Sequence, residues 1–212
     1  MNEVQDQFEY RHAKNLFADC DVDGLLEALK HPDVRRSRLL RGAVIEHLGD
    51  LADSEAIPDL VEILKEDPEK SPRMHAAIAL GKIEDSRGIP ALRLALRDPE
   101  RPVRVWALDS IGRLRDRGSV ETLIALLEDE DGWVREKAAR ALGQIGDHRA
   151  SSALLEHLND PKGSVRKAVA SALVELGDSS SLRPLRDVYA QSGIFRRRAA
   201  GRALRELEER FG

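Results

Sequence analysis

The sequence is poor in aromatic residues and in cysteine. Aromatic side chains account for 4% of the 212 residues, and Cys20 is the only cysteine. A lone thiol cannot form an internal disulfide, which argues against a disulfide-held secreted scaffold and favours a reducing compartment. With so few large rings, the core is expected to consist of Leu, Ile, Val and Ala in thin layers between helices.

Long apolar runs are also missing. No stretch approaches the ~18 apolar residues of a membrane-spanning helix, and residues 1–6 lack the basic and apolar segments of a secretion signal. The sequence therefore predicts a cytoplasmic protein with no membrane contact. The net charge of −4 offers no general attraction for nucleic acid. Residues 182–212 differ, with eight arginines against four acidic residues and a local charge of +4.

An internal period is the strongest positive feature of the chain. The residues three, seven and ten positions after each of six periodic arginines are small or apolar, which is the spacing of one helix face. An acidic residue follows at position twelve. The arginines recur every 31 or 32 residues, at Arg41, Arg73, Arg104, Arg135, Arg166 and Arg197. Such a period predicts a solenoid built of small structural repeats.

Each repeat is expected to hold two helices. A second apolar stretch precedes each arginine and leads into a turn that often contains Asp-Pro, which is typical of a helix boundary. In the fourth copy this stretch includes Val120, Leu123 and Leu127. The second helix is predicted to end at the glycines of Leu80-Gly81, Leu142-Gly143, Gly146-Asp147 and Gly177-Asp178. Each unit is thus helix A, a turn and helix B.

The predicted fold class is all-α, a right-handed α-α superhelix of about six two-helix repeats. We expect residues 1–19 to form an N-terminal cap in which Phe8, Leu16 and Phe17 cover the first helical pair. Extra residues in the first copy, Pro32 to Arg38, are expected to form a protruding loop. A single solenoid domain over 20–212 is predicted, with no internal linker and with repeats at about 20–53, 54–85, 86–116, 117–147, 148–178 and 179–212.

The segment from Asp129 to Asp147, DEDGWVREKAARALGQIGD, closely resembles the short HEAT-like repeat of the phycobilin-lyase type, which is widespread in prokaryotes. The similarity is clearest over residues 54–178, and tetratricopeptide and ankyrin signatures are absent. The resemblance implies that an aspartate and an arginine bond within or between layers. The periodic arginines are therefore predicted to form a structural ladder, with ligand contact as the open alternative. The matching acids, six residues before an arginine, are Asp67, Asp98, Asp129 and Asp160.

Binding in a solenoid is expected on the outward, concave face of the B helices. Copies two and three are apolar there, where other copies are charged, and a clustered apolar patch is costly to leave in water. We predict Trp106 as the anchor of a partner-binding surface. An equal alternative is that these positions are ordinary core between layers. The apolar patch is Met74, His75, Ile78, Val105 and Trp106, and its polar rim is Asp109, Arg113, Lys137 and Arg140.

No catalytic motif, metal-ligand cluster or cofactor motif is visible in the sequence. Deoxyhypusine hydroxylases are similar in repeat type but need repeated His-Glu pairs, whereas this chain has only Glu46-His47 and Glu156-His157. The leading hypothesis is a non-catalytic, monomeric or weakly dimeric scaffold that binds a protein segment. One alternative is a bilin-lyase-like subunit that handles a tetrapyrrole or acts as a chaperone.

A second alternative is nucleic-acid binding. In this hypothesis the chain resembles HEAT-like DNA glycosylases, and the arginine-rich end contacts phosphates in a salt-dependent way. The global charge of −4 and the nearby acids Glu206, Glu208 and Glu209 argue against it. The arginines concerned are Arg183, Arg186, Arg196, Arg197, Arg198, Arg202 and Arg205.

Overall fold

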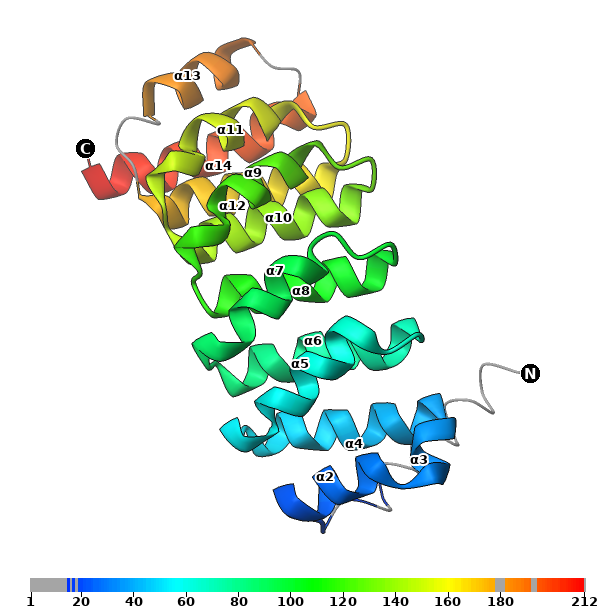
Figure 1. Cartoon of the computed structure of the whole chain (residues 1–212). Helices are drawn as coiled ribbons and strands as arrows, with labels where there is room; N and C mark the ends of the chain where they lie inside the picture. The colour runs from blue at the N-terminus through cyan, green and yellow to red at the C-terminus, as the bar shows by residue number, and fades with distance from the viewer. Residues whose placement is uncertain (1–14, 16, 18, 178–181, 192–193, 212) are drawn as a thin grey trace. The chain divides into compact units, whose positions relative to one another are not determined.

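The computed structural model describes residues 15, 17, 19–177, 182–191 and 194–211 (Figure 1). All regular elements in these ranges are helices, which confirms the all-α class. None of these helices is long and apolar enough to cross a membrane. Backbone contacts divide the chain into two compact units, Met1–Ser110 and Ile111–Gly212.

The first unit stacks helical pairs in chain order. Helix α4 packs against α2 and α6, and α6 also packs against α5 and α7. Helices α2, α5 and α7 are the A helices of the first three copies, and α4, α6 and α8 are the B helices. The helices are α2 (Val22–Lys30), α3 (Pro32–Arg36), α4 (Arg38–Leu51), α5 (Ile57–Glu66), α6 (Lys70–Ile83), α7 (Ile89–Ala95) and α8 (Arg101–Arg113), which ends just beyond the unit.

The second unit repeats the arrangement. Helix α12 packs against α10, α11 and α14, and α13 packs against α14. The helices are α9 (Val120–Ala125), α10 (Gly132–Ile145), α11 (Ser151–Glu156), α12 (Gly163–Leu176), α13 (Leu182–Gln191) and α14 (Ile194–Phe211). Short 3-10 turns flank the A helices of both units: η1 (Ser54–Ala56), η2 (Ser86–Gly88), η3 (Arg117–Ser119), η4 (Leu126–Glu128), η5 (His148–Ala150) and η6 (His157–Asn159).

The acidic residue twelve positions after each of the first four arginines caps the start of the next copy. Asp53 accepts a hydrogen bond from the backbone N–H of Glu55 (2.9 Å), and Asp85 accepts one from Arg87 (2.9 Å). Asp116 and Asp147 likewise each accept a hydrogen bond from the backbone N–H of the residue two positions further on. Each carboxylate therefore caps the 3-10 turn that leads into an A helix, because it satisfies an N–H that the turn leaves without a partner.

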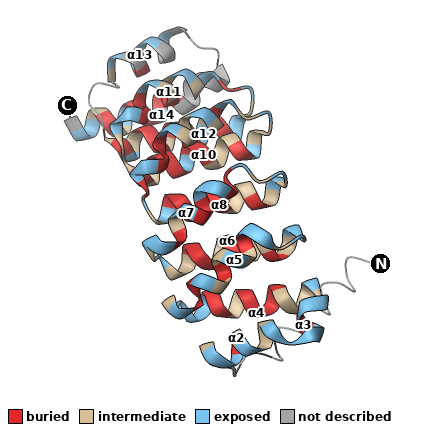
Figure 2. Ribbon diagram, viewed as in Figure 1, coloured by how far each residue is buried: buried red, intermediate tan, exposed pale blue. Residues whose placement is uncertain are grey.

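The predicted inward positions of the B helices form the core. The residues three and seven positions after the arginine are buried in all six copies, from Val44 and Leu48 to Ala200 and Leu204. The tenth position is less uniform, since Leu51 is 48% exposed whereas Ile145 is buried. In Figure 2 buried residues line the B helices along much of their length.

Two of the four glycines predicted to end helix B, Gly81 and Gly143, lie inside it instead. A Cβ added to Gly81 would stand 2.2 Å from Ser110 Oγ, and one added to Gly143 would stand 2.8 Å from Ala172 Cα. These glycines let B helices of successive copies approach closely, so the prediction of a helix end at these positions was wrong. The prediction is confirmed at Gly146 and Gly177, which end α10 and α12 with positive φ. Glu84 ends α6 in the same way.

The prediction of a protruding loop in the first copy is also wrong. Its residues form the short helix α3, with His31 as N-cap and Pro32 at the first position. Val34 is buried and holds α3 against the unit. Phe8 and Leu16 of the predicted N-terminal cap lie outside the described residues, and the single-solenoid domain division stays a prediction.

Candidate functional site

The predicted apolar patch occupies two neighbouring helices of the first unit. Met74, His75 and Ile78 lie on α6, and Val105, Trp106 and Asp109 lie on α8; all six are half-buried. We call these six residues the B-helix face. The two helices are in direct contact, because Ser110 Oγ on α8 donates to the carbonyl oxygen of Ala77 on α6 at 2.7 Å.

The repeat sets the register of the B-helix face. Met74 and Val105 each follow a periodic arginine directly, so they hold equivalent places on adjacent helices. His75 is fixed by its own helix, since its Nδ1 lies 2.7 Å from the carbonyl oxygen of Ser71 and donates to it. The face therefore combines apolar side chains with an oriented imidazole and the carboxylate of Asp109.

The equivalent surface of the second unit is charged. A groove of about 440 Å³ lies between α10 and α12 and is lined by Glu136, Arg140, Lys167 and Glu175, among others. Arg140 pairs with Glu136 at 3.6 Å. Burial raises the pKa of Glu175 above its ordinary value, although the positive charge of Arg140 acts in the opposite direction. This groove suits polar partners rather than an apolar anchor.

The predicted polar rim is divided between the two units. Asp109 belongs to the first unit, whereas Arg113, Lys137 and Arg140 belong to the second. Arg113 and Arg140 are exposed, and Lys137 is half-buried. The structure thus places seven of the nine predicted residues on the adjacent helices α6 and α8, because Arg113 is the last residue of α8. The place of Lys137 and Arg140 beside them stays a prediction.

The periodic arginines contact the backbone of their own copy. Nη1 of Arg73 donates to the carbonyl oxygen of Asp67 at 2.9 Å and to that of Pro68 at 3.2 Å. Arg104, Arg135 and Arg166 make the same pair of bonds. These bonds close the turn between helices A and B. The side chain of Arg197 lies outside the described residues.

Three of these arginines also bind the carboxylate of the following copy. The nitrogen–oxygen distances are 3.2 Å for Arg41 and Asp67, 2.9 Å for Arg73 and Asp98, and 2.7 Å for Arg135 and Asp160. Burial alone would raise the pKa of Asp160. Hydrogen bonds from Arg135 and from the backbone N–H of Lys162 outweigh it, and the pKa is lowered.

The arginine-rich end is partly neutralised by its own acids. Arg186 pairs with Glu208 at 2.7 Å and Arg202 pairs with Glu206 at 2.8 Å. Arg183 and Arg205 are exposed, while the side chains of Arg196, Arg197 and Arg198 lie outside the described part of the chain. Across that part, no three His, Cys, Asp or Glu side chains gather as metal ligands would.

Two strongly exposed apolar residues were not among the predicted site residues. Leu94 on α7 is 64% exposed, and Trp133 at the start of α10 is 58% exposed. The ammonium of Lys162 stands 5.3 Å from the centre of the Trp133 ring, in the geometry of a cation–π contact. A tryptophan within an otherwise polar turn was the sequence signal for this position.

Paired helices stacked in register, with a contact ladder that repeats every 31 residues, define an α-helical repeat protein. The chain belongs to the HEAT-repeat family: the family pattern described as HEAT repeats matches residues 22–104 and 89–165, and a second HEAT repeat pattern matches residues 152–180. No curated protein matches the sequence.

Several solved structures share this fold. One is the complex of CpcE and CpcF of phycocyanin lyase from Nostoc sp. PCC7120, with 26% identity, a TM-score of 0.68, and coverage of 86% of this chain and 75% of that one. An engineered protein has 22% identity, a TM-score of 0.62, and coverage of 90% and 97%. A designed armadillo repeat protein in complex with the peptide (KR)4 has 20% identity, a TM-score of 0.61, and coverage of 89% and 100%.

Proposed function

We propose that this protein is a non-catalytic scaffold that binds a protein partner through the B-helix face of the first unit. The supporting observation is that two adjacent helices both carry half-buried apolar side chains, Met74 and Ile78 on α6 and Val105 and Trp106 on α8. These side chains are only half-buried, so part of each remains available to a partner. Tryptophan suits the anchor role because it offers large contact area together with a polar N–H.

A polar rim would orient the partner around this anchor. We assign that role to Asp109, Arg113, Lys137 and Arg140, because charged groups at an interface rim stay hydrated and steer association. The arginine ladder, by contrast, is proposed to be structural, since its donors are engaged by carbonyl and carboxylate oxygens. We expect a monomer or weak dimer in the cytoplasm of a prokaryote.

The test replaces single residues of the B-helix face by acids. Val105→Glu introduces the residue that the fourth copy carries at the equivalent position, Glu136, so the helix should tolerate it. Trp106→Asp is the stronger change, and its folding must be checked by circular dichroism. Both variants should lose the partners that the wild-type protein captures from a native lysate.

The matched control is Trp133→Asp, which alters an exposed tryptophan on α10 that is not among the residues of the B-helix face. It should retain the partners that the wild-type protein captures. If the folded Val105→Glu protein retrieves the same partners at unchanged strength, the B-helix face is not the binding surface.

A second candidate function is bilin-lyase-like handling of a tetrapyrrole. The likeness to the CpcE and CpcF complex of phycocyanin lyase, at 26% identity over 86% of this chain, favours it. In this hypothesis Trp106 stacks on the ligand, His75 lies beside it, and arginines bind its carboxylates. Mixing the protein with a bilin at micromolar concentration should change the visible absorption spectrum. An unchanged spectrum removes this candidate.

A further inference from the structure

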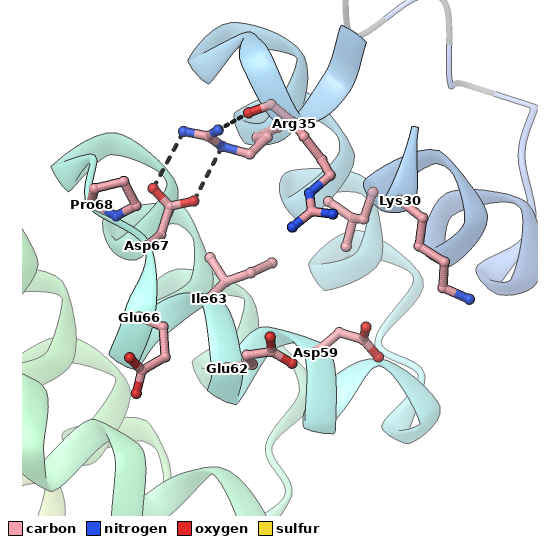
Figure 3. Close-up of a pocket in the computed structure, with 10 residues that line it drawn as sticks. Lys30, Arg35, Asp59, Glu62, Ile63, Glu66, Asp67 and Pro68 are labelled. Carbon is pink, nitrogen blue, oxygen red and sulfur yellow. Dashed lines mark hydrogen bonds and ion pairs between the residues drawn. The ribbon is translucent and has the colours of Figure 1, made fainter. Parts of the chain in front are cut away.

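A second candidate site, a cleft, lies in the first unit and shares no residue with the B-helix face. A cleft of about 470 Å³ opens between α2, α3, α4 and α5 (Figure 3). Its lining includes no residue of α6 or α8. The volume falls within the ~300–1,000 Å³ of typical ligand pockets.

One wall of the cleft exists because of the insertion that only the first copy carries. Pro32 starts α3 and the buried Val34 fixes it, so the next residue, Arg35, is exposed at the cleft. The backbone carbonyl of Arg35 accepts a hydrogen bond from Nη1 of Arg41. The guanidinium of Arg35 points into the cleft in Figure 3 and forms no ion pair with the described residues.

The opposite wall is one face of α5. Asp59, Glu62 and Glu66 are spaced by three and four residues, which places them along a single face over about 10 Å. Their carboxylates make no ion pair with described residues. Asp67, at the end of this wall, differs because Arg41 binds it at 3.2 Å. The guanidinium of Arg35 on one wall and the three carboxylates on the other therefore line the cleft without an ion pair to described residues.

The floor between the two walls is apolar. Leu29 and Ile63 line it and are half-buried. Lys30 also borders the cleft, but its Nζ is held 2.7 Å from Glu27. An occupant must therefore combine an apolar side chain with charges of both signs. Because an extended chain rises about 3.3 Å per residue, the row of carboxylates matches about three residues of a peptide.

We propose that this cleft binds a short extended peptide segment. An apolar side chain of the segment rests on Leu29 and Ile63, its basic side chains lie along Asp59, Glu62 and Glu66, and an acidic group meets Arg35. The binding is charge-assisted on both walls, so it requires both signs of charge in the same segment. This site is independent of the partner surface proposed for α6 and α8.

The experiment uses the full-length chain and a fluorescent peptide of Glu, Leu, Lys and Lys with blocked ends. Fluorescence polarisation should show saturable binding that weakens as salt is raised. A peptide in which Gln replaces all charged residues should bind at least about tenfold more weakly, as expected from the loss of several charge-assisted contacts.

Variants on the two walls localise the binding. Arg35→Glu and Glu62→Lys should each weaken it about five- to tenfold. A peptide with Lys in place of its Glu should recover affinity for the Arg35→Glu protein. The matched control is Arg36→Glu, because Arg36 is exposed on α3 but does not line the cleft.

Val105→Glu should leave peptide binding unchanged, which separates this test from that of the B-helix face. The proposal is overturned if the charged peptide does not saturate, if the neutral peptide binds equally well, or if Arg36→Glu weakens binding as much as Arg35→Glu does.

Discussion

Arg73 and Asp98 form a two-pronged contact between successive copies of the repeat. Nε of Arg73 lies 2.9 Å from Oδ2 of Asp98, and Nη2 lies 3.0 Å from Oδ1. The side chains are 12% and 9% exposed. The remaining terminal nitrogen donates to the carbonyl oxygen of Asp67 at 2.9 Å. One guanidinium thus joins the turn of its own copy to the carboxylate of the next, which a lysine ammonium cannot do.

Substitution of Arg73 should therefore destabilise the fold in a graded way. Arg73→Lys keeps the charge but loses the two-pronged geometry and the carbonyl bonds, at a cost of about 1–3 kcal/mol in the free energy of unfolding. Arg73→Ala leaves the carboxylate of Asp98 without its main partner in a nearly buried site and should cost about 3–5 kcal/mol. Urea denaturation followed by circular dichroism measures both losses.

Arg87→Lys is the matched control. Arg87 pairs with Asp85 at 2.8 Å, but its side chain is 57% exposed, so water replaces the lost contacts and the loss of stability should be much smaller than that of Arg73→Lys. Equal losses from Arg73→Lys and Arg87→Lys would show that the ladder contributes no more than an ordinary surface ion pair.

Gly81 should not tolerate a methyl group. In Gly81→Ala the new Cβ would meet Ser110 at 2.2 Å from Oγ and 3.0 Å from Cα, so α6 and α8 must move apart. We expect a net loss of about 1–3 kcal/mol in the free energy of unfolding, despite a gain of about 1 kcal/mol in helix propensity. Thermal denaturation of Gly81→Ala and Gly163→Ala measures the difference. At Gly163 the nearest atom would be 3.5 Å away, so that variant should be neutral or slightly more stable.

The fold class and the inward face could be predicted because they depend on the spacing of residues along one helix. Val44, Ala138 and Leu142 are buried as the 31-residue period requires. The role of Gly81 could not be predicted, because it depends on Ser110, a residue of the neighbouring copy. From the sequence alone, a glycine between two apolar stretches is equally compatible with the end of a helix and with a close contact between two helices.

The exposure of the candidate site could not be predicted from the sequence, for a related physical reason. Val105 and Trp106 lie at the edge of the buried stripe, where exposure depends on how closely neighbouring helices pack. The cleft at Arg35 was also missed. The insertion in the first copy signalled an irregularity, but only the structure shows that it folds into α3, which the buried Val34 holds in place as a wall of the cleft.

Acid should weaken one of the caps between copies. Side-chain and backbone hydrogen bonds from Arg149 lower the pKa of Asp147 from 3.8 to about 2. Because the folded-state pKa is lowered, this stabilisation is present above about pH 4 and is lost as the pH falls towards 2. The difference in unfolding free energy between wild type and Asp147→Asn should therefore shrink over that interval. In Arg149→Gln, titration of the Asp147 carboxyl by NMR should give a pKa closer to 3.8, and an unchanged pKa would contradict this assignment.

The residue eleven positions after the arginine ends helix B with a left-handed backbone in five copies, at Ala52, Glu84, Arg115, Gly146 and Gly177. Ala52 has a φ of 54°, a conformation that costs a residue with a Cβ about 1–2 kcal/mol. Ala52→Gly removes that cost, while the added chain entropy of glycine in the unfolded state costs about 0.5–1 kcal/mol. The net gain should be about 0.5–1 kcal/mol, measured as a higher urea midpoint. Gly146→Ala is the reverse test: its new Cβ would meet no atom closer than 4.0 Å, so its expected loss of about 1 kcal/mol comes from the backbone alone. If Gly146→Ala left the midpoint unchanged, the left-handed turn would not be what selects glycine at this position.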